Sequence, residues 1–290
     1  MQSLKDKYAF IDEYRSTCSV CLLCRLLDVS RSAYYQSKHR KMGKRETNNQ
    51  ILLRAIIETH QKYPAFGLDS MYHYLKPKFG ASRARIHRLM VKFNIHSIRT
   101  RAYKLTTNSE YSRSIAPNLV NRNFNPPLPN MIWVGDITYI NTAQGWLYLA
   151  IVKDLCTKKV VGYSFSNRID SKLVCEALLM AINRQNPPDN LIFHSDRGSQ
   201  YSSYDFRKLL AAHHIHQSMS RKGNPYDNAV AENFFSCLKC EFSFFQNFKS
   251  RSEAQIAIFR YIEGYYNLVR PHSSLNWLSP NVFEQSFKIS

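Results

Sequence analysis

The sequence contains no run of about 18 consecutive apolar residues, the length that a helix needs to cross a bilayer. The apolar stretch Leu147–Val152 is much shorter than that. We also find no secretory leader, which would combine basic residues with an apolar core. These absences argue against membrane-embedded and secreted classes. We therefore expect a soluble, intracellular protein without a membrane partner.

Acidic residues are also scarce. The 290 residues include 21 Asp and Glu against 40 Lys and Arg, which gives a net charge of +19. Such a surplus suits a polyanionic partner such as DNA, because cations that contact phosphates release bound counterions. Residues 1–120 hold 22 basic and 8 acidic residues, whereas residues 121–290 hold 18 and 13. We expect the amino-terminal part to provide the main nucleic-acid-binding surface.

The sequence lacks a complete set of cysteine ligands for zinc. Its seven cysteines are an odd number, so they cannot all pair within one chain. Cys18, Cys21 and Cys24 form a CxxCxxC run, but a structural zinc site needs four ligands and no fourth lies nearby. We expect these three to lie on the buried face of a helix, and Cys237 and Cys240 to be core residues as well.

Residues 19–38 have the pattern of a helix-turn-helix. An apolar helix ends at Asp28, and Ser30 can cap a second helix that begins at Arg31. Arg31 and the polar residues after it could reach phosphates or base edges. A small helical hairpin that binds protein has the same pattern, so both functions stay open.

A second helical module follows, with an amphipathic helix predicted over residues 47–63. Another helix opens near Asp69, and we expect Pro77 and Gly80 to stop it. Ser82 can then cap a basic helix. We expect three of its residues to contact DNA: Arg83, Arg85 and Arg88. A basic face that is merely solvated is the alternative.

The domain boundaries come from changes in composition. Helical periodicity is lost over residues 105–130, where Ser, Asn and Pro accumulate, and the prolines favour an extended linker. We therefore predict a helix-turn-helix-like segment over 1–46 and a second DNA-binding module over 47–104. Residues 131–290 should form the catalytic core with a helical tail.

Residues 131–290 change to a β-rich pattern. We predict strands over 131–140, 146–152, 159–166, 191–195 and 216–220, and helices over 171–183, 204–213, 228–242 and 252–268, with Ser252 capping the last. Three consecutive strands followed by alternating helices and strands fit a mixed five-stranded sheet with helices on both faces. The fold class is α/β, and the order resembles the ribonuclease-H-like fold, preceded here by all-α modules.

Three carboxylates could meet at one edge of this sheet. Asp136 interrupts the apolar pattern of the first strand, and Asp196 ends the fourth. In the ribonuclease-H-like topology these two strands are neighbours. Glu232 comes 36 positions after Asp196, on a helix that a turn at Gly223 and Pro225 can direct back across the sheet edge. Asp154 also ends a strand, but we do not expect it to join the site.

Acids placed together in this way repel one another unless a cation binds. Carboxylate oxygens suit Mg²⁺ or Mn²⁺. Two such ions can activate an attacking hydroxyl and stabilise the leaving oxygen of a phosphodiester. We therefore predict a site for two ions, with Asp136, Asp196 and Glu232 as ligands and catalytic residues.

Four motifs carry a resemblance to a known family. They are Trp133-x-x-Asp136-Ile137-Thr138-Tyr139, His194-Ser195-Asp196-Arg197-Gly198-Ser199-Gln200-Tyr201, Asn228-Ala229-x-x-Glu232-Asn233-Phe234-Phe235-x-x-Leu238-Lys239 and Tyr266-Asn267-x-x-Arg270-Pro271-His272-x-x-Leu275. Together they resemble the D,D(35)E signature and tail of bacterial insertion-sequence transposases of the downstream-frame (OrfB) type. The catalytic cores of that family are related to those of retroviral integrases. Two residues depart from the family pattern: Lys153 stands where apolar residues are common, and Asp69 where a basic one is usual.

The resemblance implies a DNA transposase that acts in the bacterial cytoplasm. It would bind the inverted-repeat ends of its element, expose a 3′ hydroxyl by hydrolysis and use that hydroxyl to attack target DNA. Lys239 would contact the element end, and we expect Asn228, Arg270 and His272 to contact DNA too. A homo-multimer on DNA and a fusion or partnership with an upstream-frame protein are further implications. A DNA-binding regulator and a ribonuclease-H-like nuclease of other purpose are the alternatives.

Overall fold

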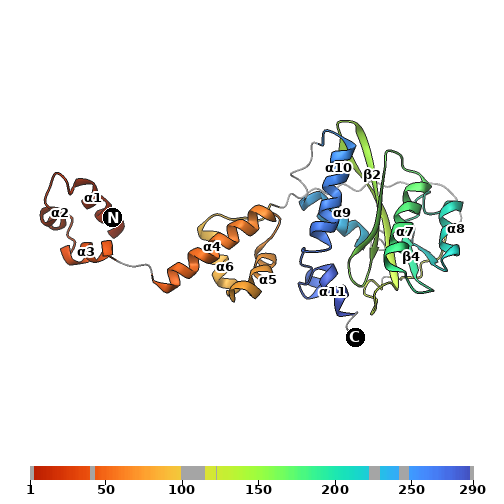
Figure 1. Ribbon diagram of the computed structural model, residues 1–290, viewed down its shortest axis with the longest axis horizontal. Helices are drawn as coiled ribbons and strands as arrows, with labels where there is room; N and C mark the ends of the chain where they lie inside the picture. The colour runs from red at the N-terminus through yellow and green to blue at the C-terminus, as the bar shows by residue number, and fades with distance from the viewer. Residues whose placement is uncertain are drawn as a thin grey trace. The chain divides into compact units, whose positions relative to one another are not determined.

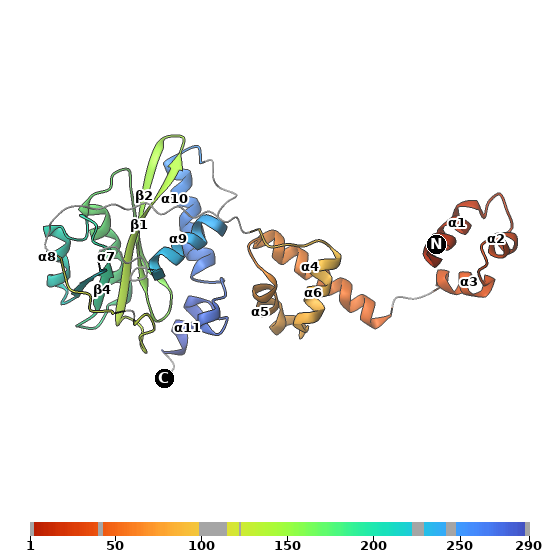
Figure 2. The same ribbon diagram turned by 180° about the vertical axis from the view of Figure 1, so that it is seen from behind.

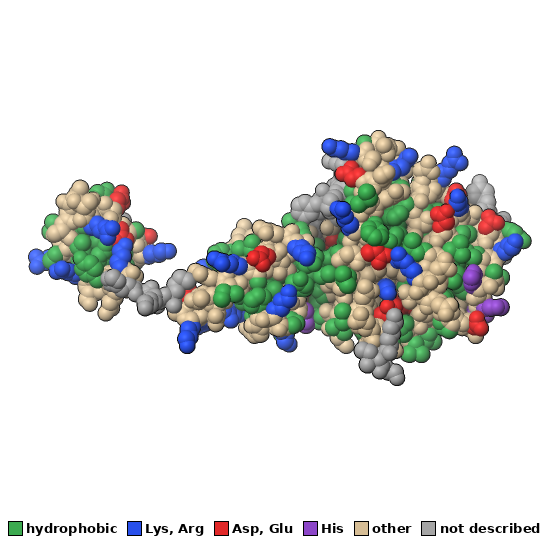
Figure 3. Space-filling view, viewed as in Figure 1, with side chains coloured by type: hydrophobic (Ala, Val, Ile, Leu, Met, Phe, Trp, Pro, Cys, Tyr) green, Lys and Arg blue, Asp and Glu red, His purple; other side chains and the backbone are tan. Residues whose placement is uncertain are grey.

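The structure, a computed structural model, describes residues 3–39, 43–98, 115–121, 123–221, 229–241 and 248–287. The chain divides into two compact units, Met1–Ala55 and Ile56–Ser290. Within the described ranges, no helix is long and apolar enough to cross a membrane. Lys and Arg side chains are spread over the helices of residues 44–98 and over the catalytic core on the face that Figure 3 shows.

The first unit is helical. Its helices are α1 (Leu4–Tyr14), α2 (Val20–Leu26), α3 (Arg31–His39) and the start of α4 (Lys44–Lys62). Ser30 caps α3 by accepting a hydrogen bond from the backbone N–H of Ala33 (3.3 Å), as predicted. Helix α4 begins before the predicted module boundary at residue 46 and runs through it. The helices α2 and α3 thus confirm the predicted pair, whereas α1 was not expected.

The prediction that Cys18, Cys21 and Cys24 share a buried helix face is wrong for two of them. Cys24 is buried with Ile11, Leu23 and Tyr34, but Cys18 and Cys21 are exposed. The reason is the position of the cap. Ser19 accepts a hydrogen bond from the N–H of Leu22 (3.3 Å), so Cys18 precedes the helix. Cys21 then lies in the first turn, on the solvent side.

The helical part of the second unit contains the end of α4 together with α5 (Leu68–Phe79) and α6 (Arg83–Lys92). Helix α5 continues through Pro77, where we expected it to stop, and ends at Gly80 with φ 57°. The burial of Met71 and Leu75 holds α5 in place, and Pro77 falls within its last turn, so few helical bonds are lost. Ser82 caps α6, as predicted, by accepting from the N–H of Arg85.

A five-stranded mixed sheet forms the centre of the catalytic core (Figure 1). The strands are β1 (Ile132–Thr142), β2 (Gly145–Asp154), β3 (Val160–Ser166), β4 (Ile192–Ser195) and β5 (His216–Met219). They lie in the order β3-β2-β1-β4-β5, with β4 parallel to both β1 and β5. The predicted ribonuclease-H-like order and the neighbouring first and fourth strands are therefore confirmed.

Helices cover both faces of the sheet (Figures 1 and 2). One layer contains α7 (Ser171–Gln185) and α8 (Tyr204–Ala212), and the other α9 (Ala229–Glu241) and α10 (Arg251–Phe259). The tail continues as a π-helix (Arg260–Tyr266), a 3₁₀ turn (Ser273–Leu275) and α11 (Pro280–Ser286). The predicted single helix over 252–268 is thus wrong in two details. Ser250, not Ser252, is the cap, and the α-helix ends at Phe259.

One glycine sets how closely α7 approaches the sheet. A Cβ atom on Gly162 of β3 would lie 2.2 Å from the carbonyl oxygen of Ala177 and 2.7 Å from the backbone nitrogen of Ala181. Glycine therefore allows the helix backbone to rest on the strand. Around this contact lies the larger core cluster, which includes Trp133 and Leu178.

Candidate active site

The two aspartates of the predicted triad lie just beyond the stretch in which β1 and β4 pair. The parallel pairing runs from Ile132↔Ile192 to Val134↔His194. Two residues beyond this pairing, β1 reaches Asp136, and the chain leaving β4 reaches Asp196. Continuing the register places the two residues at the same level. Because ligands in open α/β sheets bind at the carboxyl ends of the strands, this edge is where a site is expected.

Asp196 lies in a turn that fixes its carboxylate. Its Oδ1 accepts a hydrogen bond from the N–H of Gly198 (2.9 Å), and a Cβ on Gly198 would come within 2.9 Å of the same oxygen. Burial raises the pKa of Asp196, and the Gly198 N–H offsets only part of this effect. A cation beside the carboxylate would favour its charged form again.

Asp136 is half-buried in β1. Its Oδ1 accepts a hydrogen bond from the N–H of Ile137 (2.8 Å). Its strand partner in β2 is Ile151, which belongs to the core cluster under α9, so Asp136 faces the α9 side of the sheet.

A buried tyrosine lies beside both aspartates. Tyr201 is 2% exposed, and its hydroxyl has no hydrogen-bond partner among the described residues. Burial, followed by the negative charges of Asp136 and Asp196, holds the pKa of Tyr201 well above its usual range. The charges of the two carboxylates therefore raise the pKa of the same buried hydroxyl. Tyr201 closes the motif that begins at His194, but no local pattern predicted its burial or a role at the site.

Glu232 lies near the start of α9, which packs against β1. Phe234, Phe235 and Leu238 anchor this helix in the core. The placement of the Glu232 carboxylate falls outside what the structure describes, as do Asn228 and the turn at Gly223 and Pro225. Among the described side chains, no group of three His, Cys, Asp or Glu is arranged to hold a metal.

The donor set at this edge fits a hard divalent cation. Asp136 and Asp196 supply carboxylate oxygens, which are the ligands that Mg²⁺ and Mn²⁺ prefer. The Tyr201 hydroxyl has no hydrogen-bond partner among the described residues. It supports the fit, because buried polar groups are usually hydrogen-bonded, and a bound ion with its water could supply this bond. Helix α9, whose backbone includes residue 232, packs against β1 and covers the face of the sheet that Asp136 faces.

Lys239 lies on the exposed side of α9, seven residues after Glu232. Its ammonium group is 5.3 Å from the ring centroid of Tyr139 on β1. An exposed cation at this edge suits the predicted contact with DNA, which stays a prediction.

Arg270 and His272 have partners within the chain. The Nη2 of Arg270 donates to the Oε1 of Glu241 at 2.7 Å, and these side chains are only 12% and 3% exposed. Burial and the charge of Arg270 lower the pKa of His272 to about 2, so this ring is neutral. The Arg270–Glu241 pair joins the tail to the end of α9. The predicted DNA contacts of Arg270 and His272 remain untested.

The predicted DNA contacts in the amino-terminal helices lie on surface positions. Arg31 opens α3 and is exposed, with its guanidinium 5.8 Å from the ring centroid of Tyr35. Arg83 forms an ion pair with Asp69 (2.6 Å), the residue that departs from the family pattern. On α6, Arg88 is exposed and Arg85 is half-buried. The contacts of all four arginines with DNA remain predictions.

Two charged residues of β2 are structural. Asp154 is buried and accepts hydrogen bonds from the N–H groups of Asn130 and Thr157, both at 2.7 Å, so it fixes a turn, consistent with our leaving it out of the metal site. Lys153 is 2% exposed, and burial lowers its pKa to about 7. Its ammonium group lies 5.7 Å from the ring centroid of Tyr266. Sequence reasoning marked Lys153 as unusual but not as buried.

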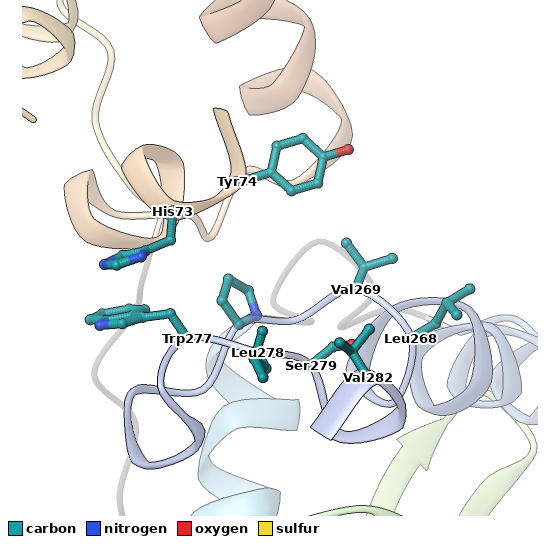
Figure 4. Close-up of a pocket in the computed structure, with 9 residues that line it drawn as sticks. His73, Tyr74, Leu268, Val269, Trp277, Leu278, Ser279 and Val282 are labelled. Atoms are coloured by element: carbon teal, nitrogen blue, oxygen red, sulfur yellow. The ribbon is translucent and has the colours of Figure 1, made fainter. Parts of the chain in front are cut away.

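A cavity of about 300 Å³ lies away from the aspartates, between α5 and the tail (Figure 4). His73 and Trp277 form one wall, with stacked rings whose centroids are 4.5 Å apart. Most of the remaining lining residues are apolar, among them Leu268, Val269 and Val282. This lining offers no acids for phosphodiester chemistry, so the candidate active site is the β1–β4 edge.

Comparison with known proteins shows which family the chain resembles. Two family profiles, both described as integrase core domain, match residues 126–225 and 213–280. The Insertion element IS600 uncharacterized 31 kDa protein of Shigella sonnei is 39% identical over 269 residues, covering 91% of this chain and 98% of its own.

Two further relatives are named as transposases. The Transposase for insertion sequence element IS904 of Lactococcus lactis is 38% identical, covering 85% of this chain and 98% of its own. The Transposase InsF for insertion sequence IS3A of Escherichia coli is 36% identical, covering 96% of this chain and 98% of its own.

Proposed function

The chain belongs to the insertion-sequence transposases that carry an integrase core domain, and from this premise we propose that Asp136, Asp196 and Glu232 form its DNA-cutting and DNA-joining site. The observation that carries the proposal is the pair of aspartates at the β1–β4 edge. Their register places them at the same level beyond the paired strands, and burial, together with the charges of both, raises the pKa of Tyr201. Helix α9, which packs on β1, supplies the third acid.

In this proposal the three acids hold two divalent ions, Mg²⁺ or Mn²⁺. The ions would make a hydroxyl nucleophilic and stabilise the leaving oxygen of the phosphodiester. The protein first directs water to the element end, which frees a 3′ hydroxyl, and then directs that hydroxyl to target DNA. Gly198 holds Asp196 in place through its N–H, and the turn around it keeps the carboxylate at the sheet edge.

The DNA partners are the inverted-repeat ends of the element and a target duplex. Lys239 contacts the element end, and Arg31, Arg85 and Arg88 contact phosphates. Because two ends must be held together, the working form is a homo-multimer on DNA in the bacterial cytoplasm. An upstream-frame protein, fused or bound, completes the recognition of the ends.

The test is an in vitro assay with the full chain and DNA that carries an element end. We expect cleavage and joining with Mg²⁺ and none with a chelator. Asp136→Asn, Asp196→Asn and Glu232→Gln should each abolish both steps and leave end binding nearly unchanged, because only the metal ligands are altered. Mn²⁺ should raise the melting temperature of the wild type but not of Asp196→Asn. An acid variant that cuts at the wild-type rate would remove that residue from the site.

A further inference from the structure

The outer half of the β1–β2 hairpin carries exposed aromatic side chains. Tyr139 is 45% exposed and Trp146 is 48% exposed, and their ring centroids lie 5.1 Å apart in an edge-to-face arrangement. Tyr148, half-buried, is the direct cross-strand partner of Tyr139. Tyr139, Trp146 and Tyr148 form what we call the aromatic strip. Exposed rings grouped in this way are a recurrent mark of a binding surface.

Beside the aromatic strip, β1 has no paired strand on its β4 side among the described residues. Among the described residues, β1 pairs with β4 only from Ile132 to Val134, and the remaining contact on that edge is the bridge between Thr142 and Phe248. The core cluster under α7 and α8 contains Tyr148 only as a partly buried member and contains neither Tyr139 nor Trp146. Packing among the described residues therefore does not account for the two most exposed rings.

Positive charge adjoins the aromatic strip on two sides. The ammonium group of Lys239 lies 5.3 Å from the ring centroid of Tyr139. Arg251 donates from Nε to the carbonyl oxygen of Trp146 (3.1 Å), and its Nη2 would be 3.2 Å from a Cβ on Gly145 at the hairpin turn. Aromatic faces combined with cations bind single-stranded nucleic acid, because bases stack on the rings while the cations attract the phosphates.

The strip lies close to the catalytic acids. Tyr139 is three residues from Asp136 along β1, a distance of about 10 Å at the rise of a β-strand. The distance of about 10 Å between Asp136 and Tyr139 equals about three nucleotides along one strand of B-form DNA, at about 3.4 Å per nucleotide. The side chains of Asp136 and Tyr139 point to opposite faces of the sheet, but Lys239 reaches from one face to the other. It comes from α9, on the Asp136 side, and its ammonium group reaches the ring of Tyr139.

We propose that the aromatic strip, with Lys239 and Arg251, binds an unpaired base of the DNA within a few nucleotides of the phosphate that the acids hold. The inference rests on the proposed function, because the acids define where the DNA lies. Separating the strands at the element end exposes bases that lose their stacking partners. The rings of Tyr139 and Trp146 replace those partners, and the two cations neutralise the adjoining phosphates.

The experiment compares two element-end duplexes of equal length, one fully paired and one with three unpaired nucleotides at the end. Equilibrium affinity is measured with the full chain in Ca²⁺, which supports binding without cleavage in many such assays, and cleavage is measured separately in Mg²⁺. Trp146 fluorescence gives a local signal. Trp146→Phe identifies the share of the signal that comes from Trp146 rather than from Trp133 and Trp277.

The wild type should bind the unpaired end more tightly, and this DNA should quench the fluorescence of Trp146. Tyr139→Ala and Trp146→Ala should each lose about 5- to 100-fold in affinity for the unpaired end and little for the paired one. Tyr139→Phe should behave like the wild type, because stacking needs the ring and not the hydroxyl. The matched control is Tyr204→Ala, which removes an aromatic ring that is 69% exposed on α8 and should change neither affinity.

Equal losses for both DNAs, or no loss, would overturn the proposal. So would a loss of self-association with unchanged DNA affinity, which would make the strip a protein interface. A failure of the proposed function looks different: the wild type would not cleave in Mg²⁺, whether or not the strip discriminates the two ends. Circular dichroism of each alanine variant shows whether the fold is intact, and Tyr139→Phe retains the ring where Tyr139→Ala fails to fold.

Discussion

At the scale of single residues, the site is defined by what is buried beside the acids. The Tyr201 hydroxyl is buried without a partner among the described residues, and burial and the charges of Asp136 and Asp196 raise its pKa. An unsatisfied buried hydroxyl costs about 1–3 kcal/mol of folding free energy. The chain tolerates this cost at a position where an incoming cation and its water could supply the missing hydrogen bond. Buried polar groups without partners are therefore informative about function.

Tyr201→Phe tests this view of the hydroxyl. Without divalent metal, we expect the variant to be more stable than the wild type by about 1 kcal/mol, because the unsatisfied group is gone. Its gain in melting temperature with Mn²⁺ should be smaller than that of the wild type. Tyr163→Phe is the matched control. Its hydroxyl donates to Glu263 (3.0 Å), so this change should lower stability and leave the response to Mn²⁺ unchanged. Equal responses in all three proteins would contradict the prediction.

Lys153 gives a stability effect that depends on pH. Its pKa is lowered to about 7, chiefly by burial; Cys237 acts in the opposite direction, and the charges of Lys158 and Arg270 add to the lowering. An unfolded lysine keeps its proton to about pH 10.4. Between pH 7 and about 10 the unfolded chain therefore binds more protons, and the contribution of Lys153 to stability rises with pH. Below pH 7 both states are protonated and this contribution is constant.

Lys153→Met should remove that part of the pH dependence. We expect the free energy of unfolding at pH 7 to rise by about 1–4 kcal/mol, because a buried charge is replaced by an apolar side chain of similar length. The gain should shrink toward pH 9. Urea denaturation at the two pH values measures both effects, with the exposed Lys239→Met as the control. A gain that is the same at pH 7 and pH 9 would show that Lys153 does not titrate in this window.

At the scale of helices and strands, most elements were predictable because their ends are marked locally. Ser82 caps the start of a helix, and the β-rich residues around Val134 mark a strand. The adjacency of β1 and β4 followed from the order of the elements, and with it the placement of Asp136 and Asp196 at the same level. The π-helix at Arg260 could not be predicted, because helical periodicity alone does not distinguish it. The burial of Lys153 and Tyr201 depends on segments far apart in the sequence, so no local pattern indicates it.

The contact between β3 and α7 is the element-scale feature most sensitive to a single methyl group. Gly162→Ala would place Cβ 2.2 Å from the carbonyl oxygen of Ala177, so the helix must move away from the sheet. We expect a loss of about 3 kcal/mol or more in unfolding free energy. Gly264→Ala has no atom within 4 Å of the new Cβ and should be neutral or slightly stabilising. Denaturant unfolding compares the two, and equal effects would show that the helix backbone can adjust.

At the scale of the whole molecule, the charge distribution separates binding from chemistry. The amino-terminal 120 residues carry most of the surplus of positive charge, and the carboxyl-terminal part contains the three acids that we propose as metal ligands. The structure modifies this division in one place. Arg83 is paired with Asp69, whereas Arg88 on the same helix is exposed and bonded only to a backbone carbonyl among the described contacts. We therefore assign more of the phosphate binding to Arg88 than to Arg83.

The salt dependence of DNA binding tests this assignment. For a duplex of arbitrary sequence, the logarithm of the binding constant should fall linearly with the logarithm of the salt concentration, with a slope of about −0.9 per phosphate contact. Arg88→Gln should make the slope shallower by about 0.9, and Arg83→Gln should change it less, because Asp69 already neutralises that guanidinium. Lys172→Gln is the matched control, since its side chain is 80% exposed on α7 of the catalytic core. Equal changes for Arg83→Gln and Arg88→Gln would show that DNA displaces Asp69 from its partner, so that both arginines bind phosphate.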